Sequence, residues 1–136
     1  MPDKKLTILI SAIIILLVAH DFDHFVRGDI RWELTARTVP VFAILAVQYA
    51  VLAFGLYFYL KNKIGPLFFV IVAGAGIVLN FLAHFSPFSD QTPQVIYRAY
   101  AAPAAGALAV LVLALLMLTL VATAAYARYL WAKGPK

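Results

Sequence analysis

Four long runs of apolar residues constrain the fold of this chain more than any other feature. They cover residues 6–24, 39–60, 64–85 and 99–130. Each is close to or above the roughly 20 residues that an α-helix needs to cross the apolar core of a bilayer. A transmembrane β-strand would need about half that length and would alternate apolar with polar residues. The sequence therefore predicts an all-α integral membrane protein, with four transmembrane helices in an up-down bundle that forms a single domain over residues 1–136.

The composition agrees with a membrane protein and excludes other classes. The chain is 65% hydrophobic and 12% charged, whereas a soluble domain is usually roughly 45–50% apolar and about 25% charged. Disorder is excluded because it needs low hydrophobicity and high charge. The chain has no cysteine, which excludes disulfides, thiolate metal ligands and cysteine nucleophiles. The net charge of +5 does not indicate nucleic-acid binding, because the basic residues form short clusters at the ends of the apolar runs.

The first apolar run resembles a signal peptide in part. Lys4 and Lys5 precede the run Leu6–Ala19, as positive charges precede the apolar region of a signal peptide. Leu17 stands where cleavage would favour a small residue, so we interpret the segment as an uncleaved membrane anchor. Leu6–Ala19 is only about 21 Å long as a helix. The span therefore has to extend to roughly His24 to cross the bilayer.

The charged residues predict the orientation in the membrane. With the N-terminus inside, seven basic residues fall on the cytoplasmic side and four fall outside. The cytoplasmic residues are Lys4, Lys5, Lys61, Lys63, Arg128, Lys133 and Lys136, and the outer residues are Arg27, Arg31, Arg37 and Arg98. All acidic residues except Asp3 fall outside. The positive-inside rule therefore places both termini in the cytoplasm, in a bacterial-type inner membrane or a plasma membrane.

Two prolines mark the beginning of the fourth span. Thr92 and Pro93 form a typical start for a helix that leads into this span, with threonine as the N-cap and proline in the first turn. Pro103 then falls inside the expected helix. Because proline lacks a backbone N–H, it either kinks the helix or marks its true start.

The outer ends of the first and third spans carry the densest group of polar residues. Its members are His20, Asp21, Asp23, His24 and Arg27 in the first span, with Asn80 and His84 in the third. Positions 20, 23, 24 and 27 share one face if the first helix continues through them. Ionisable groups at the edge of a membrane are costly to bury, so they are expected to face protein or a water-filled cavity and to be paired.

We first interpret this group as a metal site on the extracytoplasmic side. His20 and His24 at i, i+4 can bind one ion, and His84 and Asp23 would complete a set suited to zinc, copper or iron. The residues expected to orient the ligands or balance their charge are Asp21, Arg27, Asn80 and Arg98. This interpretation predicts a small accessory or binding subunit without catalytic activity of its own.

Three other interpretations stay open. A membrane-embedded redox enzyme, or a subunit of one, would use either the metal ion or a b-type haem between His84 and either His20 or His24. Titration of these groups near neutral pH would suit a small proton-coupled transporter, although no acidic residue lies in the middle of a span. The simplest alternative is a solvated loop in which the side chains cap helices and pair with arginines. It applies most directly to the acidic residues Asp29, Glu33 and Asp90.

Small residues in the fourth span indicate close helix packing. They are Ala101, Ala102, Ala104, Ala105, Gly106, Ala107 and Ala109. Ala102 and Gly106 have the small-xxx-small spacing that allows two helices to approach closely. This face would serve packing within the chain, contact with other membrane subunits, or a homo-oligomer. The bilayer is the other expected partner, and no nucleic acid is expected.

Overall fold

A computed structural model describes residues 2–36 and 38–134, and this part of the chain contains α-helices and no strand. The helices are α1 (Lys4–Arg27), α2 (Thr38–Leu60), α3 (Pro66–His84), α4 (Pro93–Arg98) and α5 (Pro103–Ala132). Four of them are long and apolar enough to cross a membrane. The predicted all-α class with four such helices is therefore confirmed. Arg37 and Lys136, which contribute to the predicted orientation, lie outside the described residues.

The fourth predicted span, residues 99–130, differs from the observed helices. α4 ends at Arg98, and α5 begins at Pro103 rather than at residue 99. The residue before Pro103, Ala102, is extended with φ −94° and ψ 118°. Proline disfavours a helical conformation in the residue that precedes it, so the chain starts a new helix here instead of continuing one. Pro103 therefore marks the true start of the long helix.

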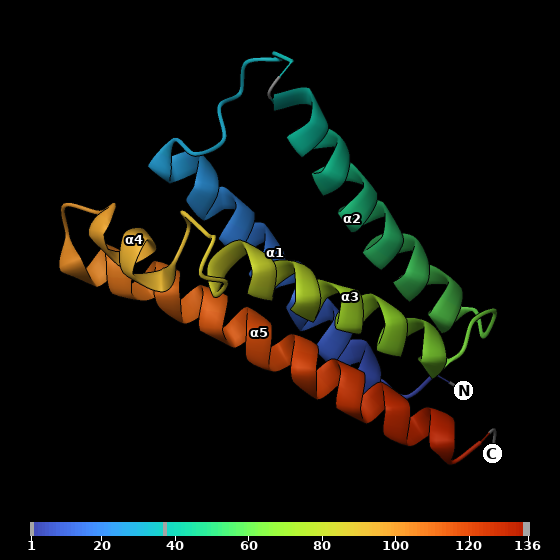
Figure 1. Cartoon of the computed structure of the whole chain (residues 1–136). Helices are drawn as coiled ribbons and strands as arrows, with labels where there is room; N and C mark the ends of the chain where they lie inside the picture. Colours follow the sequence, from blue (N-terminus) through green and yellow to red (C-terminus); the bar gives the residue numbers. More distant parts are fainter. Residues whose placement is uncertain (1, 37, 135–136) are drawn as a thin grey trace.

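The packed part of the bundle consists of α1, α3 and α5, whereas α2 leans away toward its N-terminal end (Figure 1). The buried residues of α2 are Leu52, Gly55 and Tyr59, all in its C-terminal half. The two chain termini and the α2–α3 connection lie at one end of the molecule (Figure 1). We call this the terminal end, marked by Lys4 and Lys63, and we call the opposite end, with α4 and the α1–α2 connection, the loop end.

One face of α1 points into the bundle along the whole helix. Leu6, Ile10, Ile13 and Leu17 follow one another at intervals of three or four residues, and each is at most 5% exposed. They belong to two apolar clusters that also include residues of α2, α3 and α5. His20 continues the same face and is also 5% exposed. The interior therefore changes from apolar to polar at the loop end.

The short helix α4 packs on the N-terminal part of α5. Ile96 is fully buried and forms an apolar cluster with Ala109 and Leu113. A Cβ atom added to Gly106 would collide with the backbone oxygen of Tyr97, so glycine permits this close approach. Part of the small-residue face of α5 is therefore used within the chain.

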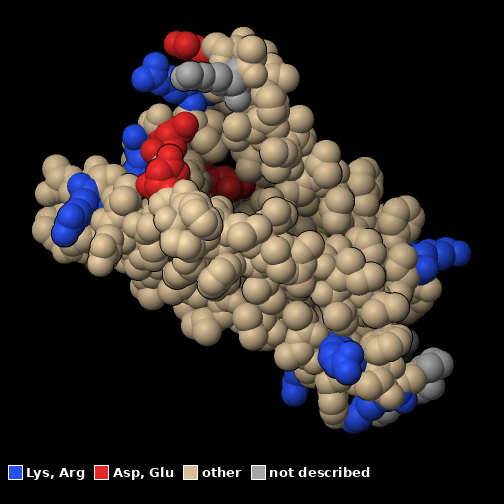
Figure 2. All heavy atoms as spheres, in the orientation of Figure 1, with Lys and Arg blue, Asp and Glu red and all other residues tan. Residues whose placement is uncertain are grey.

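The charges divide between the two ends of the molecule. The acidic side chains visible in Figure 2 gather at the loop end, whereas basic side chains are visible at both ends. Lys4, Lys5, Lys63 and Lys133 all border one cavity at the terminal end. The loop end therefore combines both signs of charge with the polar part of the interior.

Candidate metal centre

His20 and His24 lie one turn apart on α1, with their rings edge to face and their centroids 4.9 Å apart. α1 holds them together because it continues past the apolar run to Arg27. Gly28 caps its C-terminal end with a φ of 78°, which glycine readily adopts. The helical conformation of this polar segment therefore places the two imidazoles side by side.

His84 is the last residue of α3 and brings a third imidazole to the same place. Its Nε2 atom lies 3.1 Å from Nε2 of His20. The ring centroids of His24 and His84 are 5.8 Å apart. One ligand nitrogen from each residue lies within 4.8 Å of the other two. The structure thus brings together a histidine cluster, His20, His24 and His84, in which His20 and His84 are buried.

A hydrogen bond to the backbone determines which nitrogen of His84 carries the proton. Nδ1 of His84 lies 2.8 Å from the carbonyl oxygen of Gln91. Because a carbonyl can only accept, Nδ1 carries the proton and Nε2 of neutral His84 presents a lone pair. That lone pair accepts a hydrogen bond from Nε2–H of His20. Histidines that bind metals have the same pattern, with the outer N–H on a carbonyl or carboxylate and the other nitrogen on the ion.

Arg27 connects the histidine cluster to the segment between α3 and α4. Its side chain is only 2% exposed. Nε donates to Asp23 at 2.8 Å, and Nη1 donates to the side-chain oxygen of Gln91 at 2.8 Å. Nη1 also forms an ion pair with Asp29, and Nη2 lies 3.1 Å from Nδ1 of His24, to which it donates only when that nitrogen carries no proton. One guanidinium with two carboxylates has a net charge of −1, so this unit is compatible with a cation nearby.

Asp29 is a second partner of His24. Its Oδ2 atom lies 3.2 Å from Nδ1 of His24. When Nδ1 carries the proton, it donates to Asp29 and leaves Nε2 free as a ligand. A carboxylate on the outer nitrogen is a common support for a metal-bound histidine. The solvated-loop interpretation predicted that Asp29 pairs with an arginine, and Asp29 does pair with Arg27. It did not predict the contact with His24, for which the available signal is the turn at Gly28 that folds the chain back toward His24.

Asp23 was predicted as a metal ligand, and the structure gives it other partners. Its carboxylate is buried and accepts hydrogen bonds from Arg27 and from the hydroxyl group of Tyr100. Within the described residues, the group of possible ligands contains the three histidines and not Asp23. Burial, and then the hydrogen bond to Asp23, raise the pKa of Tyr100 to about 12. The phenol therefore stays protonated at physiological pH and keeps donating to Asp23.

Asp21 connects α1 to α2. It is buried next to His20, and it accepts a hydrogen bond of 2.6 Å from the hydroxyl group of Tyr49. This contact attaches the leaning half of α2 to α1 near the histidine cluster.

Asn80 and Arg98, also predicted as supporting residues, have little direct connection to the cluster. Asn80 lies one turn before His84 and donates to the carbonyl oxygen of Gly76 at 2.9 Å. Arg98 is exposed on α4, and no ion pair within the part of the chain that the structure describes includes it. Arg27, rather than Arg98, is therefore the cation that balances the acidic residues at this site.

The histidine cluster could hold a metal ion, since one nitrogen from each imidazole lies within 4.8 Å of the other two. Imidazole nitrogens suit zinc, copper, iron and nickel. Two nitrogens bound to one tetrahedral zinc ion at about 2.0–2.1 Å lie roughly 3.3 Å from each other. The Nε2 atoms of His20 and His84 lie 3.1 Å apart, close to that value, and both could bind an ion that replaces the proton on Nε2 of His20. Three protein ligands would leave one coordination position for water or another ligand.

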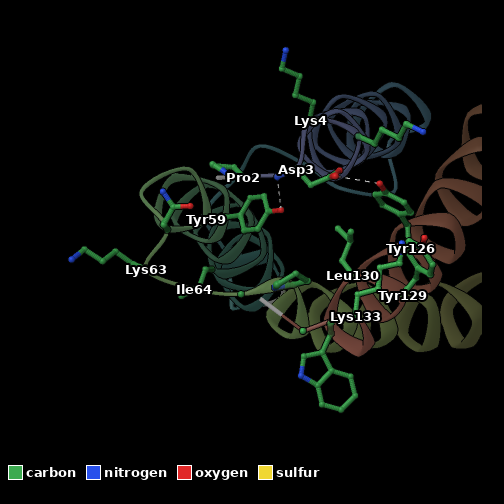
Figure 3. Close-up of a pocket in the computed structure, with 16 residues that line it drawn as sticks. Pro2, Asp3, Lys4, Tyr59, Lys63, Ile64, Tyr126, Tyr129, Leu130 and Lys133 are labelled. Carbon is green, nitrogen blue, oxygen red and sulfur yellow. Dashed lines mark hydrogen bonds between the residues drawn. The ribbon is translucent and has the colours of Figure 1, made fainter. Parts of the chain in front are cut away.

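A cavity of about 1050 Å³ at the terminal end has a different character (Figure 3). The backbone N–H of Asp3 donates to the hydroxyl group of Tyr59 at 2.9 Å, and its carboxylate accepts from the hydroxyl group of Tyr126 at 3.3 Å. The side chains of Lys4 and Lys63 point away from the cavity (Figure 3). The polar contacts here hold the start of α1 against α2 and α5, and we assign them a structural role.

Besides Asp29, three residues at the loop end were not predicted as part of the site: Tyr49, Gln91 and Tyr100. Both tyrosines fit an aromatic belt at the membrane interface equally well, so their residue type does not indicate a polar contact. Gln91 supports His84 through its backbone carbonyl, which every residue has. Only the tertiary structure, which brings α2 and the connections on both sides of α4 to the end of α1, reveals these three partners.

Comparison with known proteins finds no matching family model, no matching curated protein and no matching solved structure.

Proposed function

We propose that this chain is an integral membrane protein that binds one divalent transition-metal ion, preferably zinc, through His20, His24 and His84. The observation that carries the proposal is the approach of three imidazoles from two helices, with their ligand nitrogens within 4.8 Å of one another. The hydrogen bond from His84 to the backbone of Gln91 supports it, because it leaves the ligand nitrogen without a proton. Copper and iron are the alternatives that imidazole ligands allow.

The membrane placement is supported by the exteriors of the four long helices. Large apolar side chains are exposed on each of them, for example Ile15 at 68%, Ile44 at 63%, Leu79 at 60% and Leu118 at 66%. So much exposed apolar surface is unusual in water and expected in lipid. We propose an up-down arrangement with both termini in the cytoplasm, so that the metal site faces the extracytoplasmic side. In this arrangement the chain serves as an accessory or binding subunit.

A single ion fits this geometry better than haem. The Nε2 atoms of His20 and His84 are in direct contact at 3.1 Å. The two axial histidines of a haem bind on opposite faces of the porphyrin, so the macrocycle would have to lie between them. An absorption spectrum of the purified protein distinguishes the two cases, because only haem gives a Soret band.

Titration with metal ions tests the proposed function. The protein, purified in detergent and treated with EDTA, should bind one zinc ion per chain, and copper(II) and iron(II) are compared under the same conditions. Cobalt(II) should give the visible absorption of a tetrahedral site. A variant with all three histidines replaced by glutamine should bind none, whereas the control Asp90→Asn should bind as the natural chain does. Absence of binding, or equal binding by the triple variant, contradicts the proposal.

Labelling of introduced cysteines tests the membrane placement. The chain has no cysteine of its own, so single variants at Leu34→Cys and Lys63→Cys report on one position each. Both positions are exposed, the first on the α1–α2 connection and the second between α2 and α3. We expect an impermeant maleimide to label position 34 from outside and position 63 only after the membrane is opened. Labelling of both positions from the same side would exclude the proposed arrangement.

An enzymatic use of the ion is the second candidate. The observation in its favour is that three histidines leave a coordination position open, as in catalytic zinc sites. Chemistry that depends on the ion should then be lost together with zinc binding in His84→Ala.

A further inference from the structure

A second cavity, of about 540 Å³, opens between the N-terminal half of α2 and the packed helices α1, α3 and α5. It exists because the N-terminal half of α2 leans away from the other helices. No residue from Thr38 to Val51 is buried. Its walls are almost entirely apolar, with Val47 on one side and Leu79 on the other. The volume lies in the usual range of about 300–1,000 Å³ for small-molecule sites. We call this space the apolar cleft.

The apolar cleft approaches the histidine cluster from the side of the terminal end. Leu17, which lines the cleft, precedes Asp21 by one helical turn, and Asn80 precedes His84 by one turn. On α2, Tyr49 is bonded to Asp21 and directly follows Gln48, another lining residue. A molecule in the cleft would therefore have its tail among apolar side chains and its head close to the polar end of the bundle.

Two amide side chains are the polar groups of the cleft. Gln48 forms no hydrogen bond with any residue that the structure describes, and Asn80 uses one N–H on its own helix. An amide without a partner in an apolar environment costs free energy. The cleft therefore suits an occupant that has an oxygen atom to accept hydrogen bonds from these amides.

The charges near the cleft indicate that the head group of a molecule bound there is neutral. The carboxylate nearest to its polar end along α1 is that of Asp21, which is already bonded to Tyr49. Arg27 is occupied by Asp23 and Asp29. A fatty acid or phospholipid anion would meet this carboxylate, and no lysine or arginine among the described residues lines the cleft to compensate its charge.

We propose that the apolar cleft binds one single-chain lipid with a neutral hydroxyl or carbonyl head, which Gln48 and Asn80 hold by hydrogen bonds. The proposal rests on the membrane placement described above but not on the metal. The occupant lies with its head one turn below the histidine cluster, where a metal-bound ligand would be within reach of it.

Photo-crosslinking tests this proposal. The full chain, stripped of metal with EDTA and placed in nanodiscs, is exposed to 1-hexadecanol carrying a diazirine on its chain, or to hexadecanoic acid with the same group. We expect the alcohol to label peptides of α2 and α3 that line the cleft and the acid to label them several-fold less. Val47→Trp should abolish this labelling because it fills the cleft. The matched control is Val78→Trp, on α3 at a position exposed to a similar extent outside the cleft, and it should leave labelling unchanged.

A second variant tests the contact with the head group. Gln48→Leu keeps the cleft apolar and should weaken labelling by the alcohol about two- to tenfold, the usual worth of one hydrogen bond. Three results would overturn the proposal: labelling that is spread evenly over all helices, a preference for the acid, or an α2 contact between two copies of the chain that excludes both probes. Because the metal is absent from this assay, failed zinc binding and failed lipid binding are separate results.

Discussion

His84→Ala should weaken zinc binding by more than about 100-fold, since it removes a ligand, whereas loss of a supporting group alone typically costs about 10–100-fold. The residue is 3% exposed and is the one histidine contributed by α3. Without it, His20 and His24 remain on a single helix and offer an incomplete set of ligands. Competition with a chromophoric chelator measures the affinity of each variant.

Two further variants distinguish a ligand from a supporting residue. Asp29→Asn leaves the three imidazoles in place and weakens the contacts of Asp29 with His24 and Arg27, so its loss of affinity should be intermediate. Arg98→Gln changes an exposed side chain and should have no effect. Equal affinities for the natural chain and His84→Ala would contradict the site.

Zinc should also protect the folded protein, and this gives the same variants a second readout. At a zinc concentration of about 100 times Kd, a ligand that binds only the folded state adds roughly 2.7 kcal/mol to the free energy of unfolding. The natural chain should show this gain in detergent, and His84→Ala should not. If His84→Ala unfolds without zinc at the same temperature as the natural chain, its lost affinity reflects the missing ligand and not a damaged fold.

Arg27→Met should lower the free energy of unfolding by about 3–5 kcal/mol, the usual cost of removing one partner from a buried ion pair. The guanidinium is 2% exposed, and the side chain of its partner Asp23 is 8% exposed. The change leaves that carboxylate buried with only Tyr100 as donor, and it breaks the link to Gln91. Unfolding in detergent, followed by circular dichroism, measures the loss.

The matched control for Arg27→Met is Arg98→Met, which removes an exposed arginine and should change the stability by less than about 0.5 kcal/mol. The double variant Arg27→Met with Asp23→Asn should recover part of the loss, because it removes the uncompensated charge. Similar unfolding curves for Arg27→Met and Arg98→Met would show that the ion pair contributes little.

The helical class and most helix positions could be predicted because they depend on local properties of the chain. A run such as Leu6–Ala19 is apolar over its whole length, and the i, i+4 spacing of His20 and His24 guarantees that they meet on a helix. The break before α5 was harder to predict, because Pro103 is compatible with a kink as well as with a start. The conformation of Ala102 decided between them.

The partners within the site could be predicted only in part. Aspartate next to histidine suggested that Asp23 is a ligand, yet its carboxylate is taken by Arg27 on the same helix and by Tyr100 from a distant segment. Asp29 lies in the loop after α1 and pairs with Arg27, as the solvated-loop interpretation predicts, and it also contacts His24. Which partner a side chain binds depends on which groups lie within hydrogen-bonding distance. Sequence spacing predicts such distances only between residues of the same helix.

The sequence by itself determined four long apolar helices and the concentration of histidines and acidic residues at one end of them. Hydrophobicity and helical periodicity are properties of neighbouring residues, so these features needed no knowledge of the packing. Only the tertiary structure decided that His84 meets His20 and that α2 leans away to open the apolar cleft. Both depend on how whole helices pack against one another, and that packing follows from the combined shapes of side chains far apart in the sequence.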